Sequence, residues 1–484
     1  MSGHATERAC ELWSGDGLCD AVACSVLATI SDVRESLVAQ QFVGRQERQF
    51  VRLATWMEKI DVAHQRRALN APSAFHWSVI ASDLMASLFR AHSPSPIARR
   101  YMESFQASSV REAWESHLGQ FGRYAISVAH FAGESLTLDG IDLRLPQALP
   151  ATPYSFSSEQ GCVRLIGIKD GRSVQFLVDG QPCSVDLSKR MGPVYQAKGG
   201  RLTVHRAAEL TAGGQRPVLQ PHEFSHTDLD EFRDVSASTP ESQCGLIDEV
   251  ESALACLQSY VPRDFSRLVR SMRALALKPP ESGGALAVAD PLLPGAALLT
   301  EGRHPLVLAE DFLRVDAASR FVLLRESVCL LERPDRAFGY SPWRDRPCGA
   351  IERLADALVF ERVLAFWIAV LERQETVGIE LEYATFRVAK LCRQLSIAIA
   401  SLRSVDVWSE SAAALVRQLR DNVSSHQRDA ESRGIGGDVD VVITAPEGFF
   451  KHLVDRDGAS IRVDEMIDEH LRRYSIIDNA NQPA

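Results

Sequence analysis

The sequence predicts a mainly helical protein with a small antiparallel β region, which is an α+β fold. In both outer parts of the chain, apolar residues recur at steps of three and four, the period of an amphipathic helix. Between these parts the apolar period falls to two and turn signals multiply, as expected for hairpins. The predicted regions are an N-terminal helical region (1–133), a β-rich insert (134–215), a second helical domain (216–430) and a C-terminal segment (431–484).

The N-terminal helical region takes its prediction from the spacing of apolar residues between Cys10 and about Ala132. One example is the run from Val51 to Ile60. The pattern breaks at Ser93-Pro94-Ser95-Pro96, because a proline cannot supply a helical N–H. We expect this short segment to link two helices.

The β-rich insert contains one clear hairpin. Cys162 to Ile168 is rich in β-forming residues, Lys169 to Arg172 is the turn, and Val174 to Val178 forms the returning strand. A further alternating stretch, Leu136 to Leu145, precedes the hairpin. These segments predict a small antiparallel sheet.

Helical spacing resumes after Gly245. A Pro/Gly-rich passage, Pro279 to Gly295, divides the second helical domain, and the final segment has a mixed pattern. The helices expected in this domain cover Ile247–Leu257, Phe265–Leu275, a stretch that starts near Pro305, and about 349–373, 378–403 and 407–428.

Composition and charge exclude several classes of function. With 53 Lys and Arg against 63 Asp and Glu, the chain has no general attraction for nucleic acid or anionic lipid. The first residues lack the apolar run of a signal peptide, and no stretch reaches the roughly 18 apolar residues of a membrane helix. We therefore expect a cytoplasmic protein without nucleic-acid or membrane partners. The 10 cysteines form no CxxC pair, so no zinc knuckle or dithiol site is predicted.

His222-Glu223-Phe224-Ser225-His226 is a literal HExxH motif. In a helix its two imidazoles share one face and can bind one metal, while the glutamate serves as a general base. Pro221 and the acidic residues after His226 do not resemble the flanks of a buried metal-binding helix. The favoured interpretation is an exposed linker, and the alternative is a metal site formed by His222 and His226.

Four stretches together resemble the HExxH-motif peptide-modification family, which includes iron- and 2-oxoglutarate-dependent β-hydroxylases of ribosomally synthesised peptides. The resemblance covers roughly residues 115–375, and the stretch Pro342-Trp343-Arg344-Asp345-Arg346-Pro347 is its most specific part. The other three stretches are Leu143 to Pro150, the Val163 to Gly180 hairpin and His304 to Glu310.

The resemblance implies where a metal site would lie. In the family, the HExxH helix precedes the tryptophan-arginine pair by some thirty residues, which corresponds here to Arg314-Val315-Asp316-Ala317-Ala318. Neither histidine is present, and Val315 replaces the acid, although Ala309 to Leu330 still has helical spacing. The resemblance therefore implies a retained scaffold without this metal site.

The Pro342–Pro347 loop contains the predicted ligand-binding residues Trp343, Arg344 and Arg346. Its two prolines limit the backbone, so that an arginine can be held ready for bidentate contact with a carboxylate. The carboxylate would belong to a 2-oxoglutarate cosubstrate or to an acidic peptide side chain. The alternative is an internal Arg–Asp pair with Trp343 as a packing anchor.

Two acids of the expected helix 349–373, Asp356 and Glu361, are candidates for a remnant metal ligand or a pocket carboxylate. Exposure on the helix surface, or a local pair with Arg353 or Arg362, is the alternative. The sequence contains neither a GxSxG motif nor a GxxxxGK phosphate loop, so a serine hydrolase or P-loop enzyme is not indicated.

The leading functional hypothesis is a tailoring protein of a ribosomal-peptide pathway that recognises a precursor peptide. It would act without a catalytic residue or cofactor of its own, alongside an active modifying enzyme. The first alternative is an active peptide β-hydroxylase that binds iron through His222 and His226 and uses 2-oxoglutarate. The second alternative is a zinc peptidase with Glu223 as its base.

Overall fold

A computed structural model gives the fold of the chain. The predicted fold class is confirmed, because the chain is mainly helical with small antiparallel sheets. The structure describes residues 9–10, 13–14, 21–41, 44–89, 93–144, 147–157, 162–188, 194–197, 202–206, 218–219, 243–278, 287–333, 339–344, 346–373, 378–435, 442–443 and 461–462.

The N-terminal helices form one packed group around the last of them, which contacts four of the other five. Helix α6 begins with Pro96 in its first turn and with Ser95 as its cap, so the Ser-Pro stretch separates α5 from α6 as the sequence predicts. The helices are α2 (Ala21–Ala39), α3 (Arg45–Met57), α4 (Val62–Leu69), α5 (Pro72–Phe89), α6 (Pro96–Ser104) and α7 (Val110–Ala132).

Two four-stranded antiparallel sheets follow α7 in the chain, with strand orders β1-β4-β5-β6 and β2-β3-β8-β7. Phe156 and Phe176 meet between the sheets, with ring centroids 4.9 Å apart. The strands are β1 (Leu136–Arg144), β2 (Gln147–Ala148), β3 (Tyr154–Ser157), β4 (Cys162–Lys169), β5 (Ser173–Val178), β6 (Gln181–Asp186), β7 (Val194–Ala197) and β8 (Leu202–Arg206).

The predicted hairpin turn lies against the end of α7. Gly171 has a φ of +61°, and a Cβ there would lie 2.5 Å from the Cα of Gly133, which caps α7. The amide of Gly171 donates to the carbonyl oxygen of Glu134 at 3.0 Å. Glycine at this position therefore allows the β region to dock on the helices.

The second helical part surrounds α11, which contacts α9, α10 and α12. Its helices are α9 (Gln243–Tyr260), α10 (Pro262–Ser271), α11 (Pro305–Ser327), α12 (Ala350–Glu372), α13 (Ile379–Arg403) and α14 (Glu410–Ser432). Its strands are β9 (Val218–Leu219), β10 (Ala274–Lys278), β11 (Ala287–Val288), β12 (Ala296–Thr300), β13 (Gly339–Ser341), β14 (Arg346–Cys348), β15 (Val442–Ile443) and β16 (Ile461–Arg462).

One predicted helix is wrong at its end. Helix α10 stops at Ser271, and Leu275 belongs to β10, which pairs in parallel with β12. The sequence contained no signal for this sheet, because a short apolar run such as Ala274 to Leu277 fits a buried strand and a buried helix equally well. The β structure therefore extends beyond the predicted insert.

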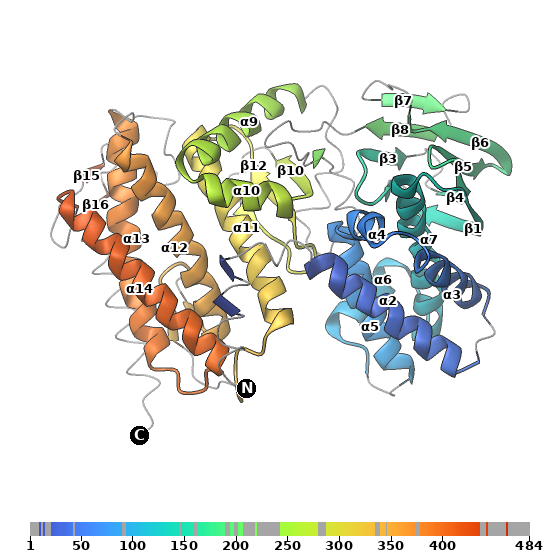
Figure 1. Cartoon of the computed structure of the whole chain (residues 1–484), viewed down its shortest axis with the longest axis horizontal. Coiled ribbons are helices and arrows are strands. Elements are labelled where there is room, and N and C mark those ends of the chain that lie inside the picture. The colour runs from blue at the N-terminus through green and yellow to red at the C-terminus, as the bar shows by residue number, and fades with distance from the viewer. Residues whose placement is uncertain are drawn as a thin grey trace.

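Figure 1 shows the two helical parts at opposite sides of the view. Helices α2–α7 and the two antiparallel sheets are on the right, and α9–α14 are on the left. Two short dark-blue pieces, residues 9–10 and 13–14, lie between α11 and α12 rather than beside α2. The beginning of the described chain therefore lies within the second helical part.

Candidate functional site

Helix α11 buries three acidic side chains, Glu310, Asp311 and Asp316, in the middle of the second helical part. The helix starts at Pro305, whose missing N–H is tolerated there, and His304 caps it by accepting from the amide of Leu306. A buried carboxylate is stable only with a compensating partner. Each of the three acids has at least one arginine partner.

Glu310 forms the most complete of these pairs. The guanidinium of Arg387 in α13 binds both carboxylate oxygens, one through Nε at 3.0 Å, and Trp367 donates its indole N–H at 2.7 Å. Burial raises the pKa of Glu310, but Arg387, Arg314 and these hydrogen bonds outweigh burial and leave that pKa below its ordinary value. The pair ties α11 to α12 and α13.

Asp311 lies between two arginines, Arg303 and Arg314, and its side chain is 1% exposed. Burial raises the pKa of Asp311 to about 6, although both arginines act in the opposite direction. Arg314 also lies over the ring of Phe360, 5.5 Å from its centroid. The turn containing Arg314 is therefore part of an ion-pair network.

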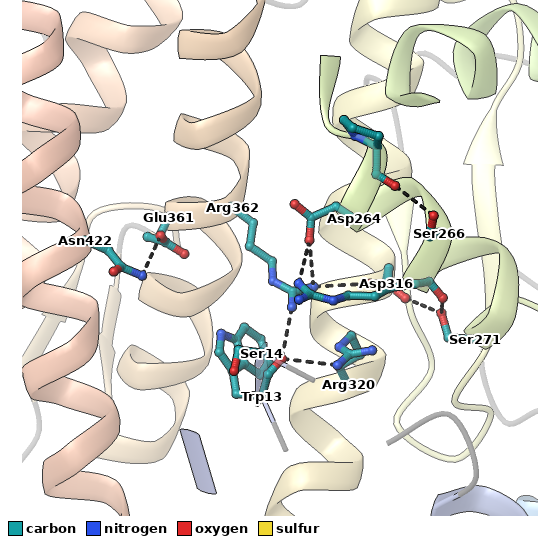
Figure 2. A network of polar contacts seen from close by, with 12 residues as sticks. Trp13, Ser14, Asp264, Ser266, Ser271, Asp316, Arg320, Glu361, Arg362 and Asn422 are labelled. Atoms are coloured by element: carbon teal, nitrogen blue, oxygen red, sulfur yellow. Dashed lines mark hydrogen bonds and ion pairs between the residues drawn. The ribbon is translucent and has the colours of Figure 1, made fainter. Parts of the chain in front are cut away.

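Asp316 accepts hydrogen bonds from Ser271 of α10 and from Arg362 of α12, whose Nη1 is 3.3 Å away (Figure 2). Asp264 approaches the same guanidinium at 4.0 Å. Burial lowers the pKa of Arg362, and the two aspartates act against that effect. A guanidinium stays protonated at any physiological pH, so Arg362 is a fixed positive charge inside the protein.

Arg362 and Arg320 converge on one oxygen atom, the main-chain carbonyl of Trp13. Each donates from Nη2 at 3.1 Å, and the Arg362 guanidinium lies over the indole ring at 4.6 Å (Figure 2). Arg320 is 1% exposed, Arg362 6% and Trp13 5%. We call Ala9, Cys10, Trp13 and Ser14 the Trp13 segment, and the two arginines with Asp316 the Arg320–Arg362 site.

The turn at residues 314–318, where the family resemblance implies a metal site, has other roles in the structure. Arg314 binds Asp311, Val315 is 2% exposed in the core, and Asp316 holds Arg362. The predicted helix is present as α11. This turn therefore contributes an ion-pair network and core packing.

The structure brings the Pro342–Pro347 loop close to the same turn. Trp343 stacks on Phe360 with centroids 4.6 Å apart and an interplanar angle of 4°, so Arg314 and Trp343 share one aromatic neighbour. Among the described contacts, the indole N–H of Trp343 is buried without a hydrogen-bond acceptor. The ligand role of Trp343 stays a prediction.

Arg344 is engaged within the protein. Its guanidinium binds Asp356 through two hydrogen bonds of 2.7 and 3.0 Å and approaches Glu352 at 3.4 Å. Ser341 also donates to Asp356, at 2.9 Å. The internal Arg–Asp pair considered from the sequence is thus present, while a ligand contact by Arg344 stays a prediction. The backbone of Arg346 belongs to β14, and its side chain lies outside the description.

Glu361 is buried and accepts a hydrogen bond from Asn422 of α14 at 3.1 Å (Figure 2). His426 lies 3.4 Å from the same carboxylate oxygen. Exposure on the helix surface is therefore wrong for Glu361. The suggested partners are also wrong, because Arg362 pairs with Asp316 and Arg353 donates to the carbonyl oxygen of Ser401.

His222, Glu223 and His226 of the literal HExxH motif lie outside the described residues. Within the described ranges, no three His, Cys, Asp or Glu side chains are grouped so that they could hold a metal ion. The described helices also include none that is long and apolar enough to cross a membrane. No protein-family model and no curated protein matches the chain.

Sequence analysis did not single out Trp13 or Arg320, and it assigned Arg362 the wrong partner. Arg362 lies between Phe360 and Phe366 on a helix whose apolar residues are buried on all sides. An arginine in that position requires an internal acidic or carbonyl partner, and this signal was available. The identity of the partner was not, because Trp13 is 349 positions away in the sequence.

Proposed function

We propose that the protein is a cytoplasmic tailoring protein of a ribosomal-peptide pathway, in which the second helical part recognises a precursor peptide beside an active modifying enzyme. On this proposal α11 serves peptide binding and provides no metal ligand from residues 314–318. The resemblance described above supplies the pathway, and the chemistry of the Arg320–Arg362 site supplies the peptide-binding role.

The observation that carries the proposal is the way in which Arg320 and Arg362 hold Trp13. A main-chain carbonyl and an aromatic ring are what any peptide with an aromatic residue presents. The two arginines bind the carbonyl oxygen at 3.1 Å each, and Arg362 also contacts the ring. Asp316 holds the guanidinium of Arg362 in place through a hydrogen bond, so the arginine side chain loses little conformational freedom when a peptide binds.

The alternative functions depend on His222 and His226. An active hydroxylase would bind iron through these histidines, with Arg344 or Arg346 holding the carboxylate of 2-oxoglutarate. The bidentate pair between Arg344 and Asp356 disfavours Arg344 for that role, because the cosubstrate would have to displace Asp356. A zinc peptidase would use the same two histidines with Glu223 as its base.

Co-expression tests the proposal. The affinity-tagged protein is produced together with the short peptides encoded beside its gene, and the eluted peptides are weighed by mass spectrometry. We expect an unmodified peptide to co-purify with the protein, and an Arg320→Met variant to retain much less of it. Arg52→Met, which removes a surface arginine paired with Asp139, is the matched control and should retain as much as the wild type.

Each other outcome has a distinct meaning. A gain of one oxygen mass that requires 2-oxoglutarate and disappears in His222→Ala supports the active hydroxylase. Chelator-sensitive cleavage that disappears in Glu223→Gln supports the peptidase. If no peptide is retained, the proposed recognition role is wrong.

A further inference from the structure

We infer that the Arg320–Arg362 site is a peptide-binding site that the chain's own Trp13 segment occupies at rest, and that an aromatic-containing peptide binds there by displacing this segment. The inference rests on the proposed function, because it specifies where the peptide binds and what regulates access. On this inference, the Trp13 segment competes with the peptide for the Arg320–Arg362 site.

The Trp13 segment binds the second helical part, whereas the helix that follows it in sequence belongs to the N-terminal helices. Helix α2, which begins at Ala21, packs on α3, α4 and α5. Trp13, by contrast, contacts Arg320 and Arg362, which are 307 and 349 positions away. The segment thus occupies the second helical part as a separate ligand would.

The contacts that hold the segment are generic. The arginines bind its main-chain carbonyl and its ring face, and Ser14 bonds back to the carbonyl of Cys10 at 2.6 Å within the segment. The contacts with the two arginines require only a main-chain carbonyl and an aromatic side chain of the same residue. A peptide with an aromatic residue can therefore satisfy the same donors.

Arg362 keeps its acidic partners when the segment leaves. Arg362 remains paired with Asp316, which also accepts from Ser271, and Asp264 stays nearby with its own partner Arg267 at 3.2 Å. An arginine that lost its only partner on displacement would resist it. Because these acids stay in place, exchange of one carbonyl for another leaves no charge of Arg362 unpaired.

Competition from a tethered segment weakens binding of an outside peptide. A tethered ligand acts at an effective concentration in the millimolar range, so a free peptide sees only the small fraction of molecules whose site is open. Removing the Trp13 ring should increase the fraction of molecules whose site is open. We expect a peptide to bind the Trp13→Ala variant about tenfold or more tightly than the wild type.

The probe for this experiment is a fluorescein-labelled peptide with the sequence of residues 5–18 and serine in place of Cys10. Its binding to the full-length wild type and to Trp13→Ala is measured by fluorescence anisotropy. A peptide with alanine at the Trp13 position controls for ring recognition. Trp56→Ala controls for loss of a partly buried tryptophan, because Trp56 lies on α3 in the N-terminal helical group.

The expected result is saturable binding to Trp13→Ala, binding about tenfold or more weaker to the wild type and to Trp56→Ala, and loss of binding for the alanine peptide. Equal binding to Trp13→Ala and wild type overturns the inference. So does absence of binding to a folded Trp13→Ala variant, and so does a Trp13→Ala variant that fails to fold, since the segment would then be a permanent part of the core.

This result is separable from the proposed function. Binding of the residue 5–18 peptide with no retention of any co-expressed precursor peptide would mean that the site works as inferred but the proposed pathway role is wrong. Retention of precursor peptide that is equal in wild type and Trp13→Ala would support the pathway role and overturn the competition.

Discussion

The two helical parts of the molecule bury polar groups in different ways. In the N-terminal helices, His117 is buried and His76 is half-buried, burial lowers the pKa of both imidazoles, and Nε2 of His117 donates to the carbonyl oxygen of Trp77 at 2.8 Å. In the second helical part, α11 buries three carboxylates against arginines from α12, α13 and neighbouring turns. A neutral group needs one backbone partner, whereas a buried ion pair needs a fixed arrangement of several helices.

The candidate site lies in the second helical part, where the buried ion pairs are. Buried ion pairs contribute little net stability, because desolvation offsets most of their attraction. Such pairs concentrate around α11, which is also where the Trp13 segment docks. In the N-terminal group, Trp77, Phe121 and Phe50 form an aromatic cluster, and the buried Glu47 pairs with an exposed arginine, Arg111.

The largest expected effect tests the ion pairs of the second part. Arg387→Met leaves Glu310 buried with the indole of Trp367 as its main remaining donor. Loss of one partner of a buried pair costs about 3–5 kcal/mol. We expect the free energy of unfolding, measured in urea, to fall by that amount.

The control for this change is Arg52→Met, which breaks the exposed pair with Asp139 and should cost less than about 1 kcal/mol. Equal losses in the two variants would contradict the difference drawn between the parts. A loss confined to Arg387→Met would sharpen it.

The next effect tests the neutral histidines of the first part. Burial lowers the pKa of His76 to about 4 and of His117 to about 3, against about 6.5 in the unfolded chain. Between pH 6.5 and 4 the unfolded state therefore binds protons that the folded state does not, so stability falls as the pH falls. Each histidine contributes up to about 1.4 kcal/mol per pH unit to the loss of unfolding free energy over this window.

The measurement is the urea midpoint at intervals from pH 7 to pH 4.5, for wild type and for His117→Gln. The variant should lose less stability than the wild type on acidification, because one of the two protonation sites is gone. If both proteins lose the same stability between pH 6.5 and 4.5, burial of a neutral His117 does not contribute to acid sensitivity.

The smallest effect concerns the loop between β13 and β14. Arg344→Lys replaces a guanidinium that binds Asp356 through two hydrogen bonds with an ammonium that cannot do so. Because the pair is partly exposed, we expect a loss of about 0.5–1 kcal/mol in the free energy of unfolding. Arg420→Lys, at the exposed pair with Asp421, is the control and should change stability by less.

Much of the second helical part followed from periodicity. The expected helices at about 349–373 and 378–403 agree with α12 and α13 within two residues, since both have long runs of apolar residues and a clear start. The strand at Ala274–Lys278 could not be predicted, because its parallel partner Ala296–Thr300 follows a separate Pro/Gly-rich passage.

The candidate site was less accessible from sequence. The position of the retained helix was predicted through Arg314 to Ala318, and an internal Arg–Asp pair was considered for the loop, but Asp356 of α12 was not identified as the partner of Arg344. The convergence of Arg320 and Arg362 on Trp13 was not, because contacts across more than 300 positions leave no local pattern. Periodicity identifies a buried face, but it does not identify what covers that face.

The most direct test of the account uses Cys10, which lies in the Trp13 segment and whose pKa burial raises. Alkylation at each cysteine is followed by mass spectrometry, with exposed Cys24 as the fast internal reference and buried Cys348 as the slow one. The predicted result is that Cys10, protected in the protein alone, reacts about as fast as Cys24 once the protein is saturated with the residue 5–18 peptide that retains the Trp13 side chain. Unchanged protection of Cys10 with that peptide bound would contradict displacement of the Trp13 segment from the Arg320–Arg362 site.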